Sequence, residues 1–78
     1  MDKEKTFETI KDIMVSEFKF ALDSINPENN LHDDLELDSL DMVDFILALN
    51  DQLGKKFEPS QFKEAKTVQG LIDIISKS

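Results

Sequence analysis

Residues 33–50, DDLELDSLDMVDFILALN, join an acidic loop to an apolar run of helical length. From Ser39 onward, apolar side chains recur every three or four positions, which is the spacing of one face of an α-helix. Asp38 is a suitable cap for the first turn, and Gly54 supplies a stop signal. The pattern predicts a helix over residues 39–53, and it raises the question of what Ser39 does at the start of that helix.

Around its circumference this expected helix divides into three zones. The broad apolar stripe that should face the core consists of Met42, Phe45, Ile46, Leu49 and Leu53. The polar stripe on the other side consists of Asp41, Asp44 and Asp51. An apolar border between them consists of Leu40, Val43 and Leu47. Either the packing of the other helices covers this border, or the border and the neighbouring aspartates form a docking surface for a partner protein.

The rest of the chain predicts further helices and no strand. Residues 3–18 carry an apolar face at helical spacing, made of Phe7, Ile10, Ile13, Met14 and Phe18. Residues 25–30 are rich in turn formers, and the loop that follows has apolar anchors at Leu31, Leu35 and Leu37. Residues 58–65 indicate a short helix opened by Pro59. The last helix should begin near Thr67, with Val68, Leu71, Ile72 and Ile75 on one side. We therefore expect an all-α fold, a small bundle of three principal helices and one short one.

Size and composition limit the possible functions. With 78 residues the chain should form one domain over residues 1–78, with a thin core. The sequence has no cysteine, which excludes disulfides, thiolate catalysis and thiolate-bound metal, and which fits the cytoplasm. No apolar run approaches the ~18 residues of a membrane span, and the first residues have no apolar signal core. A cytoplasmic protein without an integral membrane segment is expected.

The net charge of −8 is concentrated in the middle of the chain. The acidic segment, residues 28–51, contains no lysine or arginine and carries Glu28, Asp33, Asp34, Glu36, Asp38, Asp41, Asp44 and Asp51. Outside it, nine acidic residues are balanced by nine lysines. Such a segment repels nucleic acids and anionic membranes, and it steers the chain toward a basic patch on a partner protein. A merely solvated acidic face is the alternative.

Ser39 has no apparent catalytic machinery. A catalytic serine needs a base and a group that orients the base, and the only histidine is His32 in the preceding loop. Residues 20–54 also contain no lysine, so we do not expect a hydrolase or any other enzyme. An EF-hand loop starting at Asp34 fails as well, since its sixth and twelfth positions hold Ser39 and Phe45, and no metal site is predicted. A serine at a helix start is suited to bear an anion, although it is also a common cap.

Residues 34–75, DLELDSLDMVDFILALNDQLGKKFEPSQFKEAKTVQGLIDII, resemble the acyl carrier proteins of fatty acid and polyketide synthesis. The resemblance rests on Asp38-Ser39-Leu40 followed by Asp41, on the Asp-Leu pair at 34–35, and on TVQGLIDII at 67–75. It continues more weakly through the first helix. A peptidyl or D-alanyl carrier also places a modified serine at a helix start. The Asp-Ser-Leu-Asp context and the TVQGLIDII ending favour the acyl branch over these carriers. An acidic helical docking module without a prosthetic group is the alternative from another class.

The resemblance implies that Ser39 carries 4′-phosphopantetheine, derived from coenzyme A, through a phosphodiester. The thiol of that group would hold acyl intermediates as thioesters. The expected partners are a phosphopantetheinyl transferase, acyltransferases, ketosynthases and other synthase enzymes with basic docking patches. The partner-binding residues would be Asp38, Leu40, Asp41, Val43, Asp44 and Leu47. The protein would act as a monomeric shuttle and not as a catalyst.

The chain departs from the family pattern at several positions. Glu36 and Leu37 stand where small residues are usual before the serine. Phe62 stands where the family has a small residue, and Ala65 where a branched aliphatic residue lines the acyl pocket. These two acyl-pocket candidates lead to two hypotheses. Either acyl chains are sequestered differently from those of housekeeping fatty acid synthesis, or the core repacks around the exchange.

Two other departures follow Leu49 along the expected second helix. Asn50 and Gln52 replace acids that are common at the end of this helix in the family, and Lys55 and Lys56 follow Gly54. We therefore expect the acidic residues that a basic partner recognises to be concentrated at the N-terminal end of this helix.

Overall fold

The computed structural model describes residues 2–77 and is all-helical, as predicted. Its three α-helices are α1 (Lys3–Phe18), α2 (Ser39–Leu53) and α3 (Val68–Ser76). Two short 3-10 helices, η1 (Leu22–Ser24) and η2 (Pro59–Phe62), interrupt the connections. Over these residues β-structure is limited to an isolated antiparallel bridge between Asn30 and Thr67. None of the helices described is long and apolar enough to cross a bilayer.

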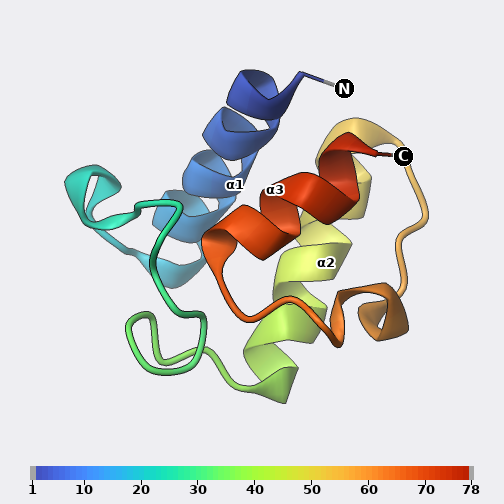
Figure 1. Ribbon diagram of the computed structural model, residues 1–78. Helices are drawn as coiled ribbons and strands as arrows, with labels where there is room; N and C mark the ends of the chain where they lie inside the picture. Colours follow the sequence, from blue (N-terminus) through green and yellow to red (C-terminus); the bar gives the residue numbers. More distant parts are fainter. Residues whose placement is uncertain (1, 78) are drawn as a thin grey trace.

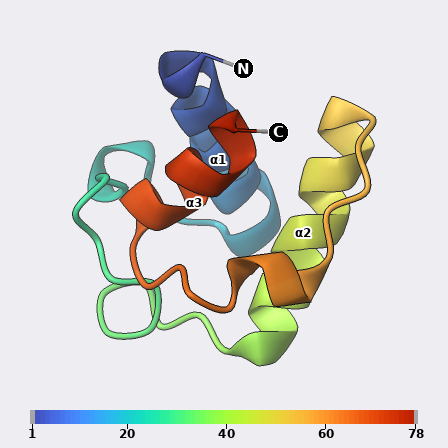
Figure 2. The same cartoon turned by 45° about the vertical axis from the view of Figure 1, so that its right-hand side comes forward.

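The helices form a small bundle in which α1 packs against both α2 and α3 (Figure 1). The long segment from 19 to 38 leaves the end of α1, runs down one side of the bundle and delivers the chain to the start of α2. After α2 the chain turns back beside that helix, and η2 then packs against both α2 and α3 (Figure 2). A loop segment and a 3-10 turn, and not a fourth long helix, therefore close one side of the bundle.

The helix ends follow the expected signals. Asp38 Oδ1 accepts a hydrogen bond from the amide of Asp41 (2.9 Å), and Asp41 Oδ2 accepts one from the amide of Asp38 (3.2 Å), which is a reciprocal capping box. The helix ends at Gly54 in the left-handed conformation, with φ 63°. Thr67 caps α3 through its hydroxyl, which accepts from the amide of Gly70 at 3.2 Å. The predicted bounds of residues 3–18 and 39–53 are confirmed.

The core is built from the apolar faces that the periodicity indicated. Its fully or nearly buried members on the three helices are Ile10, Ile13, Met14, Phe45, Ile46, Leu49, Val68, Leu71, Ile72 and Ile75. The loop anchors Leu31, Leu35 and Leu37 are buried with them. Phe7, Phe18, Met42 and Leu53, also expected in the core, are only half-buried at its edge. Ile25 and Phe57 are buried without having been predicted.

The short helix expected over 58–65 forms in the right place but is a 3-10 turn of four residues. Its first turn is closed by the Gln61 side chain, whose Oε1 accepts from the amide of Glu58 at 2.7 Å. The amide of Lys63 then donates to the carbonyl of Ser60 at 3.5 Å, and the amide of Ala65 to the carbonyl of Phe62 at 3.0 Å, both with three-residue spacing. η1 was not predicted from the sequence.

One ion pair joins the first turn of α1 to α3 in the described part of the chain, between Lys3 Nζ and Asp73 Oδ1 at 3.3 Å. Hydrogen bonds from Gln69 and Lys3 hold the pKa of the Asp73 carboxyl below its usual value. The lowered pKa of Asp73 stabilises the fold at pH values above the pKa that this carboxyl has in the unfolded chain. That stabilisation is lost as the pH falls through its lower pKa in the folded chain. Both partners are exposed, so the contribution is small.

We expect Gly54→Ala to destabilise the fold through the backbone alone. A Cβ at this position meets no atom within 4 Å, but φ is +63°, where a residue with a side chain is strained. The free energy of unfolding in urea should fall by about 1 kcal/mol. Lys19→Gly is the reverse control, because Lys19 ends α1 at φ 61° and should gain stability. A Gly54→Ala variant as stable as the wild type would show that Gly54 has another role.

Candidate functional site

Ser39 is the first residue of α2, and it is exposed. The capping of this helix is done by the carboxylate of Asp38, together with Asp41. Among residues 2–77 the Ser39 hydroxyl has no hydrogen-bond partner. Ser39 therefore begins the helix, as the simpler interpretation expected, but Asp38 and not Ser39 supplies the cap.

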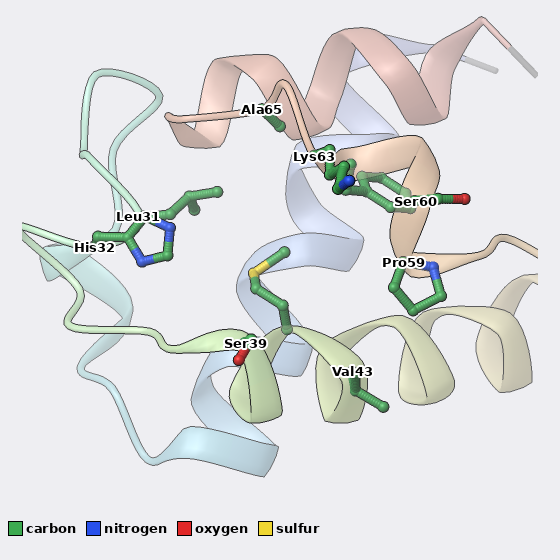
Figure 3. Close-up of a pocket in the computed structure, with 10 residues that line it drawn as sticks. Leu31, His32, Ser39, Val43, Pro59, Ser60, Lys63 and Ala65 are labelled. Atoms are coloured by element: carbon green, nitrogen blue, oxygen red, sulfur yellow. The ribbon is translucent and has the colours of Figure 1, made fainter.

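A pocket of about 420 Å³ opens beside Ser39, in the size range of small-molecule sites. It lies between the start of α2, the loop that precedes this helix, and η2 with the segment that follows (Figure 3). Its lining is formed by Leu31, His32, Ser39, Met42, Val43, Pro59, Ser60, Phe62, Lys63 and Ala65. Most of this surface is apolar, so the pocket suits an apolar group attached at its rim.

The two residues predicted to shape an acyl pocket, Phe62 and Ala65, both line this cavity. Phe62 is only 4% exposed, and its ring packs edge-on against Phe57, with the ring centroids 5.7 Å apart. Ala65 is half-buried. Ser39 and Val43 also line it, although they were predicted for attachment and partner binding, and the other lining residues were not predicted as part of a pocket because only the fold brings their segments together. The family resemblance was the only signal pointing to this region.

The loop before Ser39 is held by its own hydrogen bonds. His32 Nδ1 donates to the carbonyl of Leu37 at 2.6 Å, so this nitrogen carries the proton. The amide of Leu37 donates to the carbonyl of Leu31 at 2.9 Å, and the Leu37 side chain is buried. Leu37, one of the departures from the family pattern, is therefore a core residue that anchors the loop. Glu36, the other departure, lies exposed with φ 54°, a conformation that favours glycine.

The apolar border of α2 is open to solvent. Leu40, Val43 and Leu47 are 75%, 38% and 62% exposed. Of the two alternatives for this border, coverage by other helices is therefore wrong. Asp38 and Asp44 are exposed beside it, whereas Asp41 is half-buried and shared with the capping box. These six residues, on either side of Ser39 in the sequence, are the candidates for partner binding, and we call them the candidate docking surface.

No carboxylate of the acidic segment forms an ion pair within residues 2–77, although Lys63 lines the pocket beside Ser39. The ion pair found within residues 2–77 joins Lys3 to Asp73, and both of these residues lie outside the acidic segment. The described residues also contain no group of three side chains placed to hold a metal ion. The carboxylates therefore act as a diffuse field and not as a built cation site.

Comparison with known proteins gives a consistent result. Residues 8–75 match the family model described as a phosphopantetheine attachment site. An acyl carrier protein of Coprothermobacter proteolyticus is 36% identical over 100% of this chain and 95% of the relative. One of Lactobacillus acidophilus is 36% identical over 96% of this chain and 94% of the relative. One of Thermobifida fusca is 42% identical over 68% of this chain and 67% of the relative.

Because the acidic segment repels itself at neutral pH, divalent cations should stabilise the fold. We expect millimolar magnesium or calcium to raise the melting temperature by a few degrees, measured by circular dichroism. The two ions should act alike, since no built site among the described residues selects between them. Sodium chloride at matched ionic strength is the control and should have a smaller effect. A melting curve that does not respond to either divalent ion would contradict the expectation.

Proposed function

Because the chain belongs to the acyl carrier protein family, it carries acyl groups on a covalent 4′-phosphopantetheine, and we propose that Ser39 bears this group. The observation that supports the assignment is the free, exposed hydroxyl of Ser39 at the start of α2, beside an apolar pocket. Asp38 and Asp41 complete the helix cap without it. A modification of the hydroxyl would therefore cost no hydrogen bond within the part of the chain described.

The surroundings of Ser39 suit a phosphodiester. The first amides of α2 and the positive end of its dipole stabilise an anion at this position. The neighbouring carboxylates discourage the rest of the attached group from lying on the acidic surface. When bound, the group supplies a thiol for thioester formation, which this cysteine-free chain cannot provide. His32 directs Nδ1 to the carbonyl of Leu37, so that nitrogen is not aimed at Ser39 as a base.

A carrier of this family interacts with a phosphopantetheinyl transferase and with synthase enzymes, and its role is not catalytic. More specifically, the docking surface would bind basic patches on acyltransferases, ketosynthases and reductases. The exposed leucines would supply the apolar contact and Asp38, Asp41 and Asp44 the charge. Fatty acid or polyketide synthesis would be the pathway. Residues 1–78 would act as a single carrier domain, monomeric and in the cytoplasm.

The apolar pocket would receive the acyl chain. Its rim holds Ser39, its wall is formed in part by the buried ring of Phe62, and Ala65 leaves room where the family has a branched side chain. An attached chain that folds back into this space would remove apolar surface from water, at about 0.8 kcal/mol for each buried CH₂. The thioester would thereby be shielded from hydrolysis.

Ser39→Ala tests the attachment directly. Wild type and variant are incubated with coenzyme A and a broad-specificity phosphopantetheinyl transferase and then weighed by intact-protein mass spectrometry. The wild type should gain one phosphopantetheine and the variant none, because the phosphodiester needs the Ser39 oxygen. Circular dichroism should show the variant equally folded, since Asp38 keeps the cap. A folded wild type that gains nothing would leave only an acidic docking module.

Phe62→Ala combined with Ala65→Ile tests the acyl pocket. Removing the Phe62 ring deepens the cavity, and the isoleucine introduced by the second substitution adds apolar lining. A long-chain thioester should hydrolyse about fourfold more slowly than in the wild type, the equivalent of one further buried CH₂. If losing the Phe62 ring unfolds the thin core, Ala65→Ile alone carries the test with the opposite sign, because its larger side chain takes room from the pocket and hydrolysis should be faster than in the wild type. Equal hydrolysis rates in folded proteins would mean that the core has repacked instead.

A further inference from the structure

Asn50, in the last turn of α2, organises the reversal of the chain after that helix. Its side-chain Nδ2 donates to the carbonyl of Phe57 at 3.0 Å, and its Oδ1 accepts from the amide of Phe57 at 2.7 Å. Its backbone carbonyl accepts from the amides of Gly54 and Lys55. Four hydrogen bonds on one residue therefore fix the returning segment beside α2, where Figure 2 shows it.

The two side-chain hydrogen bonds from Asn50 to the Phe57 backbone form what we call the clamp, and Phe57 links it to the pocket. Both Phe57 and Phe62 are buried, 7% and 4% exposed, and their rings meet edge-on at 5.7 Å. Phe62 lines the pocket, as does Pro59, which lies two residues after Phe57. The one residue between them, Glu58, is itself tied by its amide to the Gln61 side chain at 2.7 Å. The backbone between Phe57 and the η2 wall of the pocket therefore has little freedom to move.

We propose that Asn50 is a positioning residue for this wall: by holding both backbone groups of Phe57, it sets how closely η2 covers an acyl chain attached at Ser39. The inference rests on the proposed function of the pocket. Without the clamp, the 55–58 segment would keep its turn at Gly54 but lose its register against α2. The wall would loosen, and a long chain inside the pocket would be less well shielded.

The clamp requires a carboxamide. Phe57 presents one donor and one acceptor, and an amide side chain matches both, whereas a carboxylate can only accept. An aspartate here would keep the bond from the Phe57 amide but face the Phe57 carbonyl with a negative oxygen. Asn50 is also half-buried, so water replaces the lost partner poorly. This gives a physical reason for an asparagine at a position where the family commonly has an acid.

The test compares thioester hydrolysis in two chain lengths. We compare the wild type with Asn50→Ala, Asn50→Asp and the control Gln52→Ala. Each protein is loaded with acetyl- or dodecanoyl-phosphopantetheine from the matching coenzyme A thioester. Gln52 is an exposed amide in the same helical turn and makes no side-chain hydrogen bond to the described residues. Hydrolysis is followed by intact-protein mass spectrometry, under conditions in which circular dichroism shows that every variant is folded. Hydrogen exchange of the Phe57 amide reports the clamp in Asn50→Ala, which loses the bond from that amide, whereas Asn50→Asp keeps it.

We expect the dodecanoyl thioester to hydrolyse about fivefold faster in Asn50→Asp, which corresponds to the loss of one hydrogen bond, and faster still in Asn50→Ala, which loses both side-chain bonds. The acetyl thioester, too short to reach the wall, should hydrolyse at the wild-type rate, and Gln52→Ala should behave as wild type. If Asn50→Ala does not fold, Asn50→Asp, which keeps one of the two side-chain bonds, carries the comparison.

Unchanged dodecanoyl hydrolysis despite faster exchange of the Phe57 amide would overturn the proposal. So would equal acceleration for both chain lengths, because that pattern reports a general loss of stability. Failure of the pocket itself looks different: the wild type would then protect dodecanoyl no better than acetyl, relative to the free pantetheine thioesters. Failure of the Ser39 assignment would appear earlier still, as protein that cannot be loaded.

Discussion

The reciprocal cap between Asp38 and Asp41 is the interaction on which the rest of the site depends. It fixes the first residue of α2 at Ser39 and thereby sets the rotation of every later side chain on that helix. With this start, Phe45, Ile46 and Leu49 face the core, and Leu40, Val43 and Leu47 face solvent. Because carboxylates do the capping, the Ser39 hydroxyl is left for chemistry. A capping serine would have to give up its hydrogen bond before it could be modified.

The pocket lies where the bundle is closed by loops instead of a helix. α1 packs against both other long helices, whereas η2 is a 3-10 turn of four residues that cannot be stable alone. Its position must therefore come from tertiary contacts, and the nearest side-chain hydrogen bonds before it in the chain join the Phe57 backbone to the Asn50 carboxamide. On the opposite side, the His32 bond to Leu37 and the buried Leu37 side chain hold the loop before Ser39. Both pocket walls are thus tied by side-chain hydrogen bonds to the backbone, one at the carbonyl of Leu37 and two at Phe57.

The helices, their ends and the position of Ser39 could be predicted because each has a local signal. Apolar spacing indicated α1 and α2, and the residue types at Asp38, Gly54 and Thr67 indicated the ends. The Asn50 clamp and the His32 bond could not be predicted, since their partners are backbone groups, which every residue has. The exposure of Leu47 also stayed open, because periodicity places a side chain on a face but does not say whether another helix covers that face. Phe62 and Ala65 were found only through the family resemblance.

The charge distribution bears on how such a carrier would bind and leave its partners. The proposed docking surface lies entirely within the acidic segment, and all nine lysines lie outside that segment in the sequence, so the charge carried by the proposed surface itself is negative. Its exposed apolar part amounts to three aliphatic side chains, with no aromatic anchor among them. A strong field raises the rate of encounter, whereas a small apolar contact keeps dissociation fast. On the proposed docking surface these two properties together favour brief, repeated visits, as a shuttle between several enzymes requires. A larger apolar patch would tighten each complex and slow the transfer of the acyl group to the next enzyme.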